Sequence, residues 1–391
     1  MNILVFPKYG EKGPSSRVRF YQYIPFLEKK GATFHCAPLL GNNYIDALYS
    51  GQRFGFFNTL NAYWNRVRKM MKRKNFDLIW MENEALPYVP FLFEDHFYRG
   101  TPPVVVNYDD AVFNRYEKHR NTVVRVLTGK KIDRVMAAAS VVVAGNPYLA
   151  ERAKSVGAKR IEILPSVINI DHYSIGKMTE ERGSVQLPES SMEACVGLPD
   201  QGHFQSEANP SENLSDAEEK LVVGWIGTPS TAHFLEIIRQ PLQQFSQTMK
   251  LELHVMGIDH FSLKGVHTKS VPWSSKGESS FLKQIDVGMM PLYDEPFERG
   301  KCGYKLIQYF ASSKPVIASP VGVNKDLVNE TNGILAVDEV AWLEALKKMA
   351  IFKKEQRLER LGQAGRKMIE KGYSIQSTVD HLWDILRSAG A

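Results

Sequence analysis

The sequence is poor in the residues that mark disulfide-rich and metal-binding proteins. It has three cysteines in 391 residues, Cys36, Cys195 and Cys302, and no Cys-x-x-Cys pair. This spacing excludes a disulfide framework and a zinc ribbon. No other cluster of metal-ligand residues occurs, so we expect no bound metal. Reduced thiols of this kind are typical of a cytosolic protein.

Long apolar runs are missing as well. Residues 1–7 have no basic flank and contain only four apolar residues in a row before Pro7. No later run approaches the ~20 apolar residues that a transmembrane helix needs. We therefore expect no secretion signal and no membrane span, and a cytoplasmic location.

Charge is distributed unevenly along a chain that is 43% hydrophobic, which is enough for a sizeable core. The formal net charge is +6, but residues 177–219 hold ten acidic and two basic residues, a local net charge of −8. The remainder therefore carries about +14. This balance predicts an anionic partner, which could be nucleic acid, an anionic membrane surface or a phosphorylated small molecule.

Short β-rich apolar runs alternate with helical patterns in two successive series, which indicates two doubly wound, Rossmann-like α/β domains facing an interdomain cleft. We expect domain boundaries at 1–172 and 220–374, separated by an acidic flexible insertion at 173–219, and a terminal helix at 375–391 that docks on a neighbouring surface. Asn146-Pro147 and Gly157 are typical start and stop signals of a helix. The expected strands are 3–6, 33–37, 78–81, 104–107, 141–144 and 161–164, then 221–226, 251–256, 268–271, 287–290, 315–318 and 333–336.

Ligands of parallel sheets bind beyond the carboxyl ends of the strands, so the loops that follow strands are the places to search. The first loop, 10–19, has neither the GK[ST] ending of a P-loop nor GxGxxG spacing, which argues against an NTPase and a nicotinamide enzyme. Its Gly13 would let backbone approach a ligand, and Arg17 could reach into the cleft. The alternative is that this loop is only a glycine turn next to a solvated arginine and binds no ligand.

A second loop, 224–232, follows the first strand of the second series. Gly227 leads into Thr228, which has the features of a helix N-cap, with Pro229 at the first helical position. The amides and hydroxyls of Ser230 and Thr231 would then form an anion site at the positive end of a helix. We favour ligand binding here over an ordinary cap.

The third loop, 295–310, is the most informative. A helix is expected to begin near Gly303, which places Arg299, Lys301 and Lys305 around its N-terminus. Cations there oppose the helix dipole by ~0.3–1 kcal/mol each, and a bound polyanion would turn that cost into attraction. A solvated basic loop before a core helix is the alternative, which we disfavour.

These loops resemble the C-terminal half of a family 4 (GT-B fold) retaining glycosyltransferase, of a subgroup with an FERGKxGYK loop. The resemblance rests on segments 224–231, 297–310 and 314–324, and on the interdomain segment 163–169. It implies a nucleotide-diphosphate sugar as co-substrate, a UDP- or GDP-sugar, held by the second domain. It implies a glycan or lipid-linked acceptor held by the first domain, and neither a bound cofactor nor a metal. It also implies that the final helix, 375–391, returns to the first domain.

The resemblance also implies roles for individual residues of the third loop. The usual pair of glutamates would fall at Gly300 and Gln308, and neither is glutamate. Gln308 is expected to keep a ribose hydrogen bond, while sugar contact passes to Glu298. Lys301, Lys305 and Arg299 would neutralise the diphosphate, with Gly303 and Tyr304 in the same donor site. Trp273 is expected to lie beside the nucleotide base of the donor.

In the first domain, the apolar run 104–107 leads into Asp109 and Asp110, where many family members carry a histidine near the reacting sugar. The aligned residue is Asp109. Adjacent side chains on extended backbone point to opposite sides, so we expect one aspartate in the cleft and the other as a helix cap. A capping role for both remains a competitor.

The pattern of segment 63–76 predicts a basic amphipathic helix, which would suit binding to an anionic membrane surface. The alternative is a solvated helix whose Met and Trp side chains pack on the sheet. Attachment to the inner face of the cell membrane would suit a lipid-linked acceptor.

Three functions are open at this point. We favour a glycosyltransferase moving a hexose-type sugar with retention of configuration, in cell-surface polysaccharide or glycolipid synthesis. A nucleotide-sugar epimerase of the same architecture is the alternative. A nucleic-acid-binding module rests on charge alone, since no DNA or RNA motif occurs, and we expect no nucleic acid partner.

Overall fold

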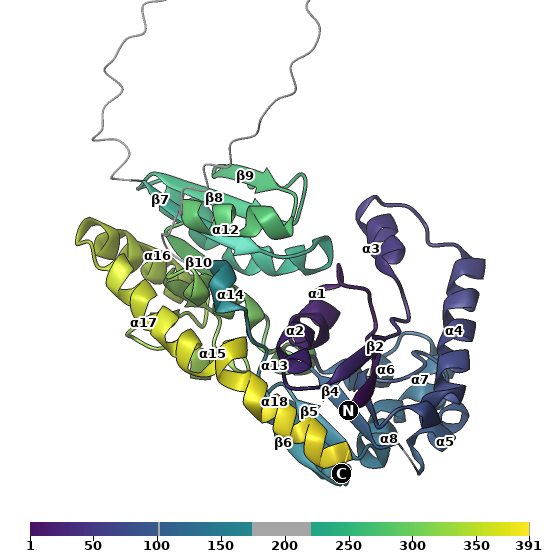
Figure 1. Cartoon of the computed structure of the whole chain (residues 1–391). Helices are drawn as coiled ribbons and strands as arrows, with labels where there is room; N and C mark the ends of the chain where they lie inside the picture. The colour runs from purple at the N-terminus through teal and green to yellow at the C-terminus, as the bar shows by residue number, and fades with distance from the viewer. Residues whose placement is uncertain (101, 174–219, 391) are drawn as a thin grey trace, which may run out of the picture.

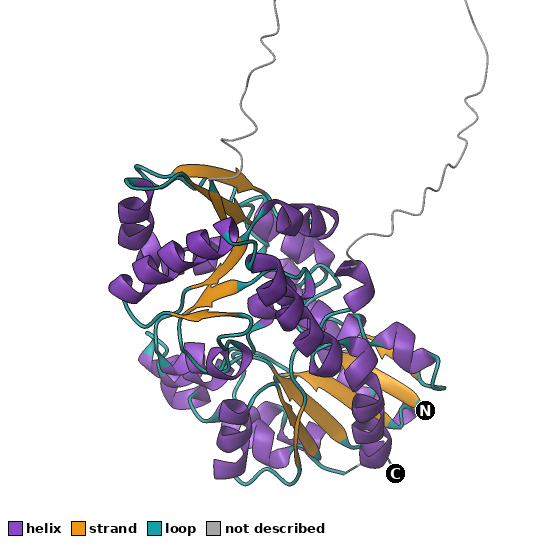
Figure 2. Ribbon diagram, turned by 90° about the vertical axis from the view of Figure 1, so that its left-hand side faces the viewer, coloured by secondary structure: helices purple, strands orange, loops and turns teal. Residues whose placement is uncertain are grey.

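The chain folds around two six-stranded parallel β-sheets with helices on both faces of each (Figures 1 and 2). The computed structural model describes residues 1–100, 102–173 and 220–390. The expected acidic insertion therefore lies almost wholly outside the described residues. None of the described helices is long and apolar enough to span a membrane.

The first sheet has the strand order β2-β1-β3-β4-β5-β6. Its central strands are buried, except for Asn2 at the start of β1, because helices cover both faces, which explains their continuous apolar sequences. The strands are β1 (Asn2–Phe6), β2 (Thr33–Cys36), β3 (Leu78–Glu82), β4 (Val104–Tyr108), β5 (Val141–Ala144) and β6 (Ile161–Ile163). The helices of this part are α1 (Pro14–Ser16), η1 (Arg17–Tyr21), α2 (Ile24–Glu28), α3 (Asn42–Tyr49), α4 (Phe56–Met71), η2 (Arg73–Asn75), η3 (Phe91–Phe93), α5 (Asp95–Tyr98), α6 (Val112–Glu117), α7 (Thr122–Thr128), α8 (Lys131–Ala138), α9 (Pro147–Ser155) and η4 (Ile170–Tyr173).

The second sheet has the order β12-β11-β10-β7-β8-β9, so the chain reverses direction across the sheet between β7 and β10. Such a switch point is where ligands of doubly wound sheets bind. The strands are β7 (Leu221–Ile226), β8 (Leu251–Met256), β9 (His267–Val271), β10 (Val287–Met290), β11 (Val316–Ala318) and β12 (Gly333–Leu335). The helices are η5 (Pro229–Ile238), α11 (Arg239–Ser246), α12 (Ser275–Gln284), α13 (Pro296–Arg299), α14 (Tyr304–Ala311), α15 (Asn324–Leu327), α16 (Glu339–Lys354), α17 (Leu358–Gly372) and α18 (Ile375–Gly390).

The structure confirms the predicted fold class and all twelve expected strands, with ends displaced by one residue at most. The predicted helix signals are confirmed too. Asn146 caps α9, because its Oδ1 accepts a hydrogen bond from the Leu149 amide at 2.9 Å. Gly157, with φ +80°, follows the end of that helix.

The last helix, α18, leaves the second sheet and packs on the first (Figure 1). Its apolar stripe, including Ile375, Leu382 and Leu386, is buried in the core beneath β1 and β3. The hydroxyls of Tyr23 in the first domain and Thr378 in α18 lie 2.9 Å apart. The C-terminal helix thus fastens the two halves of the chain together.

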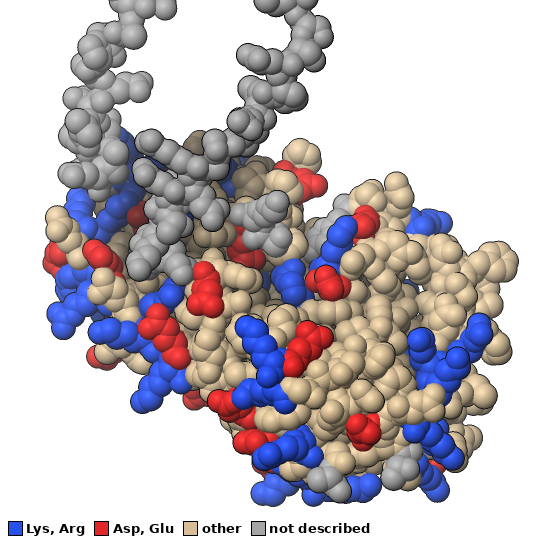
Figure 3. Space-filling model, viewed as in Figure 1, with Lys and Arg blue, Asp and Glu red and all other residues tan. Residues whose placement is uncertain are grey.

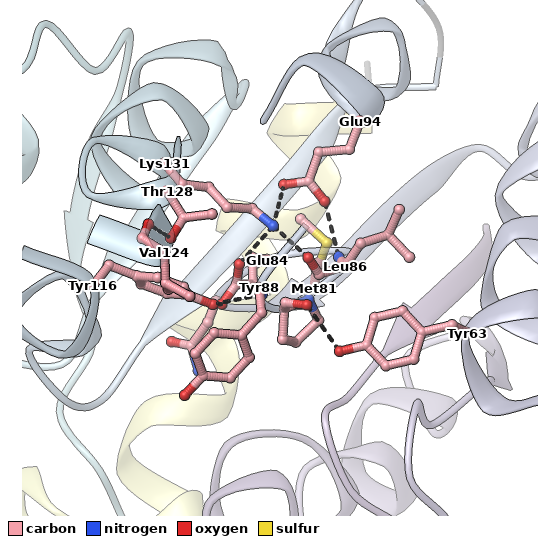
Figure 4. A network of polar contacts seen from close by, with 12 residues as sticks. Tyr63, Met81, Glu84, Leu86, Tyr88, Glu94, Tyr116, Val124, Thr128 and Lys131 are labelled. Atoms are coloured by element: carbon pink, nitrogen blue, oxygen red, sulfur yellow. Dashed lines mark hydrogen bonds and ion pairs between the residues drawn. The ribbon is translucent and has the colours of Figure 1, made fainter. Parts of the chain in front are cut away.

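A buried charged network holds the segment after β3 against α8 (Figure 4). The Lys131 ammonium lies 2.8 Å from Glu84 and 3.3 Å from Glu94, and it also donates to the Leu86 carbonyl. Tyr116 donates to Glu84 at 2.5 Å. Burial raises the pKa of Glu94 to about 7, although Lys131 opposes the rise. One buried cation therefore compensates two buried carboxyl groups.

We predict that Lys131→Met destabilises the protein by ~3–5 kcal/mol, since it leaves buried carboxyl groups without their cation. Urea unfolding followed by circular dichroism measures the loss. The matched control is Lys130→Met on the preceding residue, whose side chain is 71% exposed and pairs with Glu117 and Asp133 at the surface. That change should cost less than about 1 kcal/mol. Equal losses in the two variants would contradict the account of the network.

Candidate active site between the two sheets

A cavity of about 270 Å³ lies between the two sheets, lined by loops that follow strands of both. This volume is near the lower end of the ~300–1,000 Å³ typical of ligand pockets. The lining residues from the first domain are Pro14, Ser15, Arg17, Val18, Asp109, Asp110 and Ser166. The second contributes Ile226, Gly227, Thr228, Trp273, Glu278, Met290, Lys301, Cys302, Gly303, Tyr304, Lys305 and Gln308.

Two adjacent aspartates form the acidic wall of the cavity. Asp109 accepts a hydrogen bond from the Ser15 hydroxyl at 2.5 Å. Asp110 lies 3.7 Å from the Lys301 ammonium and 3.9 Å from the Arg115 guanidinium. Burial raises the pKa of Asp110 above its ordinary value, Lys301 opposes this rise, and Asp109 adds to it.

The prediction that one of these aspartates caps the next helix is wrong, because both line the cavity. The N-cap of α6 is Ala111, and no side chain caps it. Ala111 has φ −76° and ψ 59°, and the Val112 amide bonds to the Asp110 carbonyl at 2.8 Å. This inverse γ-turn bends the chain directly after Asp110. The two aspartates therefore do not belong to a continuous extended segment, in which their side chains would point to opposite sides.

The basic side of the cavity is the N-terminus of α14. Gly303 precedes the helix with φ +66°, a conformation that favours glycine, and no side chain caps the helix. The first amides of α14 therefore lack intrahelical partners, and the residues around this helix start, Lys301 to Lys305, line the cavity. The prediction that a helix begins here with lysines at its positive end is confirmed, and the arrangement suits a polyanion.

Lys305 is the most perturbed cation of the cavity. Burial, followed by repulsion from Lys301, lowers the pKa of Lys305 to about 7. Its ammonium lies 4.2 Å from the centroid of the buried Trp225 ring. Among the residues that the structure describes, no carboxylate lies within ion-pair distance of Lys305. An anionic ligand would supply the missing partner.

The loop after β7 brings Gly227 and Thr228 to the cavity. A Cβ atom on Gly227 would lie 1.9 Å from the Trp225 ring, so the close approach requires glycine. Thr228 is the N-cap, as predicted, but the helix that follows is the 3-10 helix η5. Thr231 accepts a hydrogen bond from the Thr228 amide at 3.0 Å, and its hydroxyl is occupied by capping. Ser230 and Thr231 are not part of the cavity lining.

A polar corner closes the cavity beside Trp273, which lines it as expected. The Trp273 indole donates to the buried Glu278 at 3.0 Å, and the Tyr173 hydroxyl donates to the other oxygen of Glu278. Tyr173 also interacts with Gln308. Arg17 stacks on Trp273, 4.6 Å from the ring centroid, so a contact between domains forms one rim.

Besides Ser230 and Thr231, three more of the predicted site residues lie outside the cavity lining: Gly13, Glu298 and Arg299. Arg299 is exposed and pairs with Asp294 at 2.6 Å, an interaction that holds the pKa of Asp294 below its usual range. Glu298 belongs to the short helix α13, ahead of the segment that enters the cleft. A Cβ atom on Gly13 would meet Tyr9, so this glycine serves a local turn.

Sequence reasoning missed several lining residues, notably Ser15, Ser166, Glu278 and Cys302. Ser15 lies within the loop that was identified, so its position could have been found. Glu278 comes from α12 and its role depends on how that helix packs on β9 and β10, which no local pattern reveals. Cys302 was interpreted only as a reduced thiol, and it is buried in the contact between the domains.

The loop that carries the lysines docks directly on the first domain. The Asn146 side-chain amide donates to the carbonyls of Gly300 at 2.8 Å and Lys301 at 3.2 Å. The Cys302 thiol donates to the Asp109 carbonyl at 3.1 Å. A Cβ atom on Gly300 would lie 2.5 Å from the Cβ atom of Ala111, so this contact needs glycine.

Within the described parts of the chain, no three His, Cys, Asp or Glu side chains gather as a metal site would require. The cavity instead combines an uncapped helix N-terminus, two lysines and two aspartates. Such a set can bind a diphosphate and orient polar groups beside it.

Comparisons with known proteins agree with the fold of two facing domains. The fold is GT-B, that of glycosyltransferases with two Rossmann-like domains. The most similar solved structures include Anabaena HepE in complex with UDP and glucose, with a TM-score of 0.64 and 14% identity over 99% of this chain and 100% of that one. Sucrose-phosphate synthase from Thermosynechococcus elongatus has a TM-score of 0.64 and 14% identity over 99% and 98% of the two chains.

Residues 221–350 match the family model described as Glycosyl transferases group 1, a segment that includes Lys301, Lys305 and most of the second domain. The enzyme is a glycosyltransferase. A UDP-forming trehalose-phosphate synthase from Burkholderia xenovorans is also similar in fold, with a TM-score of 0.59 and 11% identity over 100% and 99% of the chains. No curated protein sequence matches the chain significantly.

We predict that Gly300→Ala loosens the docking of the two domains, because the added methyl group overlaps Ala111 and overpacking costs ~1–3 kcal/mol. Hydrogen–deuterium exchange should rise in β4 and the Asp109–Ala111 turn. Gly372→Ala is the matched control, since a Cβ atom there meets nothing within 4 Å. Unchanged exchange in Gly300→Ala would contradict the assigned contact.

Proposed function

We propose that the enzyme transfers a hexose-type sugar from a nucleotide-diphosphate sugar to a glycan or lipid-linked acceptor with retention of configuration. The observation that carries the proposal is the pair Lys301 and Lys305 at the uncapped N-terminus of α14, where Lys305 has no anionic partner among the described residues. A diphosphate would place its charge there. We favour a UDP-sugar because the structurally similar HepE binds UDP-glucose.

The proposed transfer uses the donor's own phosphate as base. The bond between C1 of the sugar and the diphosphate oxygen breaks, and the acceptor oxygen bonds to C1 on the same face. The acceptor proton passes to a phosphate oxygen, and the nucleoside diphosphate leaves. In this scheme Lys301 and Lys305 stabilise the leaving charge, while the protein otherwise supplies positioning.

The opposite wall would hold the sugar and the acceptor. Asp109, fixed by Ser15, faces the cavity from the first domain and is the proposed partner of a sugar or acceptor hydroxyl. The polar corner of Trp273, Glu278 and Gln308 is the proposed site of the nucleoside. Glu278 then provides a carboxylate near Gln308, where the family pattern has a glutamate.

An epimerase would bind the same donor but yield an intact epimeric nucleotide sugar. The group 1 glycosyltransferase match of residues 221–350 does not favour it. Product analysis distinguishes the two: transfer releases free nucleoside diphosphate, and the anomeric coupling constant of the glycosylated product reports retention. We place the reaction in cell-surface polysaccharide or glycolipid synthesis, at the cytoplasmic side of the membrane.

The decisive test is donor binding by isothermal titration calorimetry with a panel of UDP-, GDP-, ADP- and TDP-sugars. One of them should bind the wild-type protein, and Lys305→Ala should raise its Kd about 10- to 100-fold, since a hydrogen bond to a charged group contributes ~1.5–3 kcal/mol.

The matched control is Arg299→Ala, a cation of the same segment that lies outside the cavity and pairs with Asp294. Its Kd should change less than about twofold, as expected for an exposed ion pair. Equal effects of the two substitutions, or no binding of any nucleotide sugar by a folded sample, would contradict the proposed donor site.

We also predict that donor affinity depends on pH through Lys305. Its pKa of about 7 in the free enzyme means that the ammonium is largely neutral above that pH and must take up a proton when a diphosphate binds. The Kd for the UDP-sugar should therefore be lowest below pH 7 and rise towards tenfold per unit above it. Calorimetry in buffers of different ionisation enthalpy measures the proton uptake.

Lys305→Arg provides the control for the pH dependence, because arginine stays charged throughout this range. The variant should bind with little pH dependence between pH 6.5 and 8.5. A wild-type Kd that is flat over the same range would rule out Lys305 as the titrating group.

A further inference from the structure

We propose that the first domain docks on an anionic phospholipid bilayer through an outer face formed by α4, η3 and α7. The most prominent feature of this face is an exposed apolar stripe on α4. Phe57, Leu60, Trp64 and Met71 recur at intervals of three, four and seven residues, and their side chains are 82%, 57%, 60% and 77% exposed. This spacing aligns them on one side of the helix.

The buried side of α4 is built differently from that of an ordinary amphipathic helix. Arg66 and Met70 point inward, and the Arg66 guanidinium donates to the Pro7 carbonyl at 2.7 Å and lies over the Phe6 ring. The helix thus buries an arginine and exposes aromatic residues. The earlier expectation of a basic helix at 63–76 is refined accordingly, since Trp64 and Met71 face outward while Arg66 does not.

Further exposed apolar side chains lie on the neighbouring segments. Leu92 and Phe93 of η3 are exposed, as are Val123, Val126 and Leu127 of α7. Arg73, at the end of α4, donates to the His96 carbonyl of α5 at 3.2 Å, and both η3 and α7 pack on α8. In Figure 1, α4, α5 and α7 occupy the same side of the first domain.

The charge of the outer face matches an anionic surface. Residues 50–76 contain no Asp or Glu and seven basic residues: Arg53, Arg66, Arg68, Lys69, Lys72, Arg73 and Lys74. Arg66 is buried and Arg73 is half-buried against His96 and Phe97. The five exposed ones are Arg53, Arg68, Lys69, Lys72 and Lys74. In Figure 3 the corresponding margin of the molecule is mostly tan and blue. Basic residues near anionic lipid contribute ~1 kcal/mol each, and inserted aromatic residues add apolar burial.

The same charge argues against a second copy of the chain as the occupant. A two-fold dimer through this face would oppose each basic α4 with another, and α4 carries no carboxylate to pair with. A bilayer with anionic headgroups has no such conflict.

A second, smaller cavity lies beside α4 in the first domain. Its volume is about 30 Å³, and it is lined by Lys8, Glu84, Tyr88 and Arg115, among others. The Tyr63 hydroxyl of α4 donates to the Pro87 carbonyl at 2.8 Å, which joins α4 to this rim. Arg115 lies beside Asp110 of the main cavity. Resting on the proposed function, docking through α4 suits an acceptor attached to a membrane lipid, because the enzyme and its acceptor would then lie at the same surface.

The test is sedimentation of the full chain with vesicles of phosphatidylcholine alone or with one quarter phosphatidylglycerol, at about 0.1 M NaCl. The protein should bind the anionic vesicles, less so as salt rises. The double substitution Phe57→Ser and Trp64→Ser, both at exposed positions, should weaken binding at least tenfold. Brominated lipids should quench tryptophan fluorescence in the wild type and much less in Trp64→Phe.

The matched control is Val340→Ser with Ile351→Ser on α16, a helix of the second domain that also exposes apolar residues next to lysines. These changes should leave vesicle binding intact. The proposal is overturned by a failure to bind anionic vesicles, by equal effects of the two double substitutions, or by self-association that the α4 substitutions abolish. UDP-sugar binding in solution should be unchanged in the α4 variant, which separates this test from that of the donor site.

Discussion

The close contact between the Gly300–Cys302 loop and the first domain is the constraint on which the rest of the site depends. Two positions without side chains permit it: a Cβ atom on Gly300 would overlap Ala111, and one on Gly145 would lie 2.3 Å from the Cys302 sulfur. The loop is held by the amide of Asn146, which also caps α9. Because this loop leads directly into α14, its docking sets the helix N-terminus opposite the aspartates that follow β4.

The electrostatics of the cavity follow from that juxtaposition. Lys301 has Asp110 at 3.7 Å, a distance that leaves the pair weak enough to be exchanged for a phosphate. Lys305 lies next to Trp225, and burial followed by repulsion from Lys301 lowers its pKa to about 7. An anion bound between the two lysines would favour the charged form of Lys305 and offset the repulsion between them.

The sequence predicts the sheets better than it predicts the cleft. Strands such as β5 and β7 are short, continuous apolar runs with clear turn signals, so their bounds follow from local physics. Lys301, Lys305 and Trp273 were also found, because Trp273 comes shortly after β9 and the two lysines flank a helix start that Gly303 marks in the sequence. Arg299 and Glu298 were misplaced because a short helix, α13, turns them away from the cavity. Glu278 was missed because only tertiary packing brings α12 to the cleft.

The resemblance stated from the sequence would place a pair of glutamates at Gly300 and Gln308. The structure shows what lies beside each of these two residues. At Gly300 the space of a side chain is taken by Ala111, so a glutamate there is incompatible with this docking of the domains. At Gln308 the neighbouring charge comes from Glu278, linked through the Tyr173 hydroxyl, which contacts both residues. A buried carboxylate therefore lies in the corner beside Trp273, and it comes from α12. The absence of a side chain at Gly300 permits the interdomain contact, and the carboxylate nearest to Gln308 belongs to a different helix of the same domain.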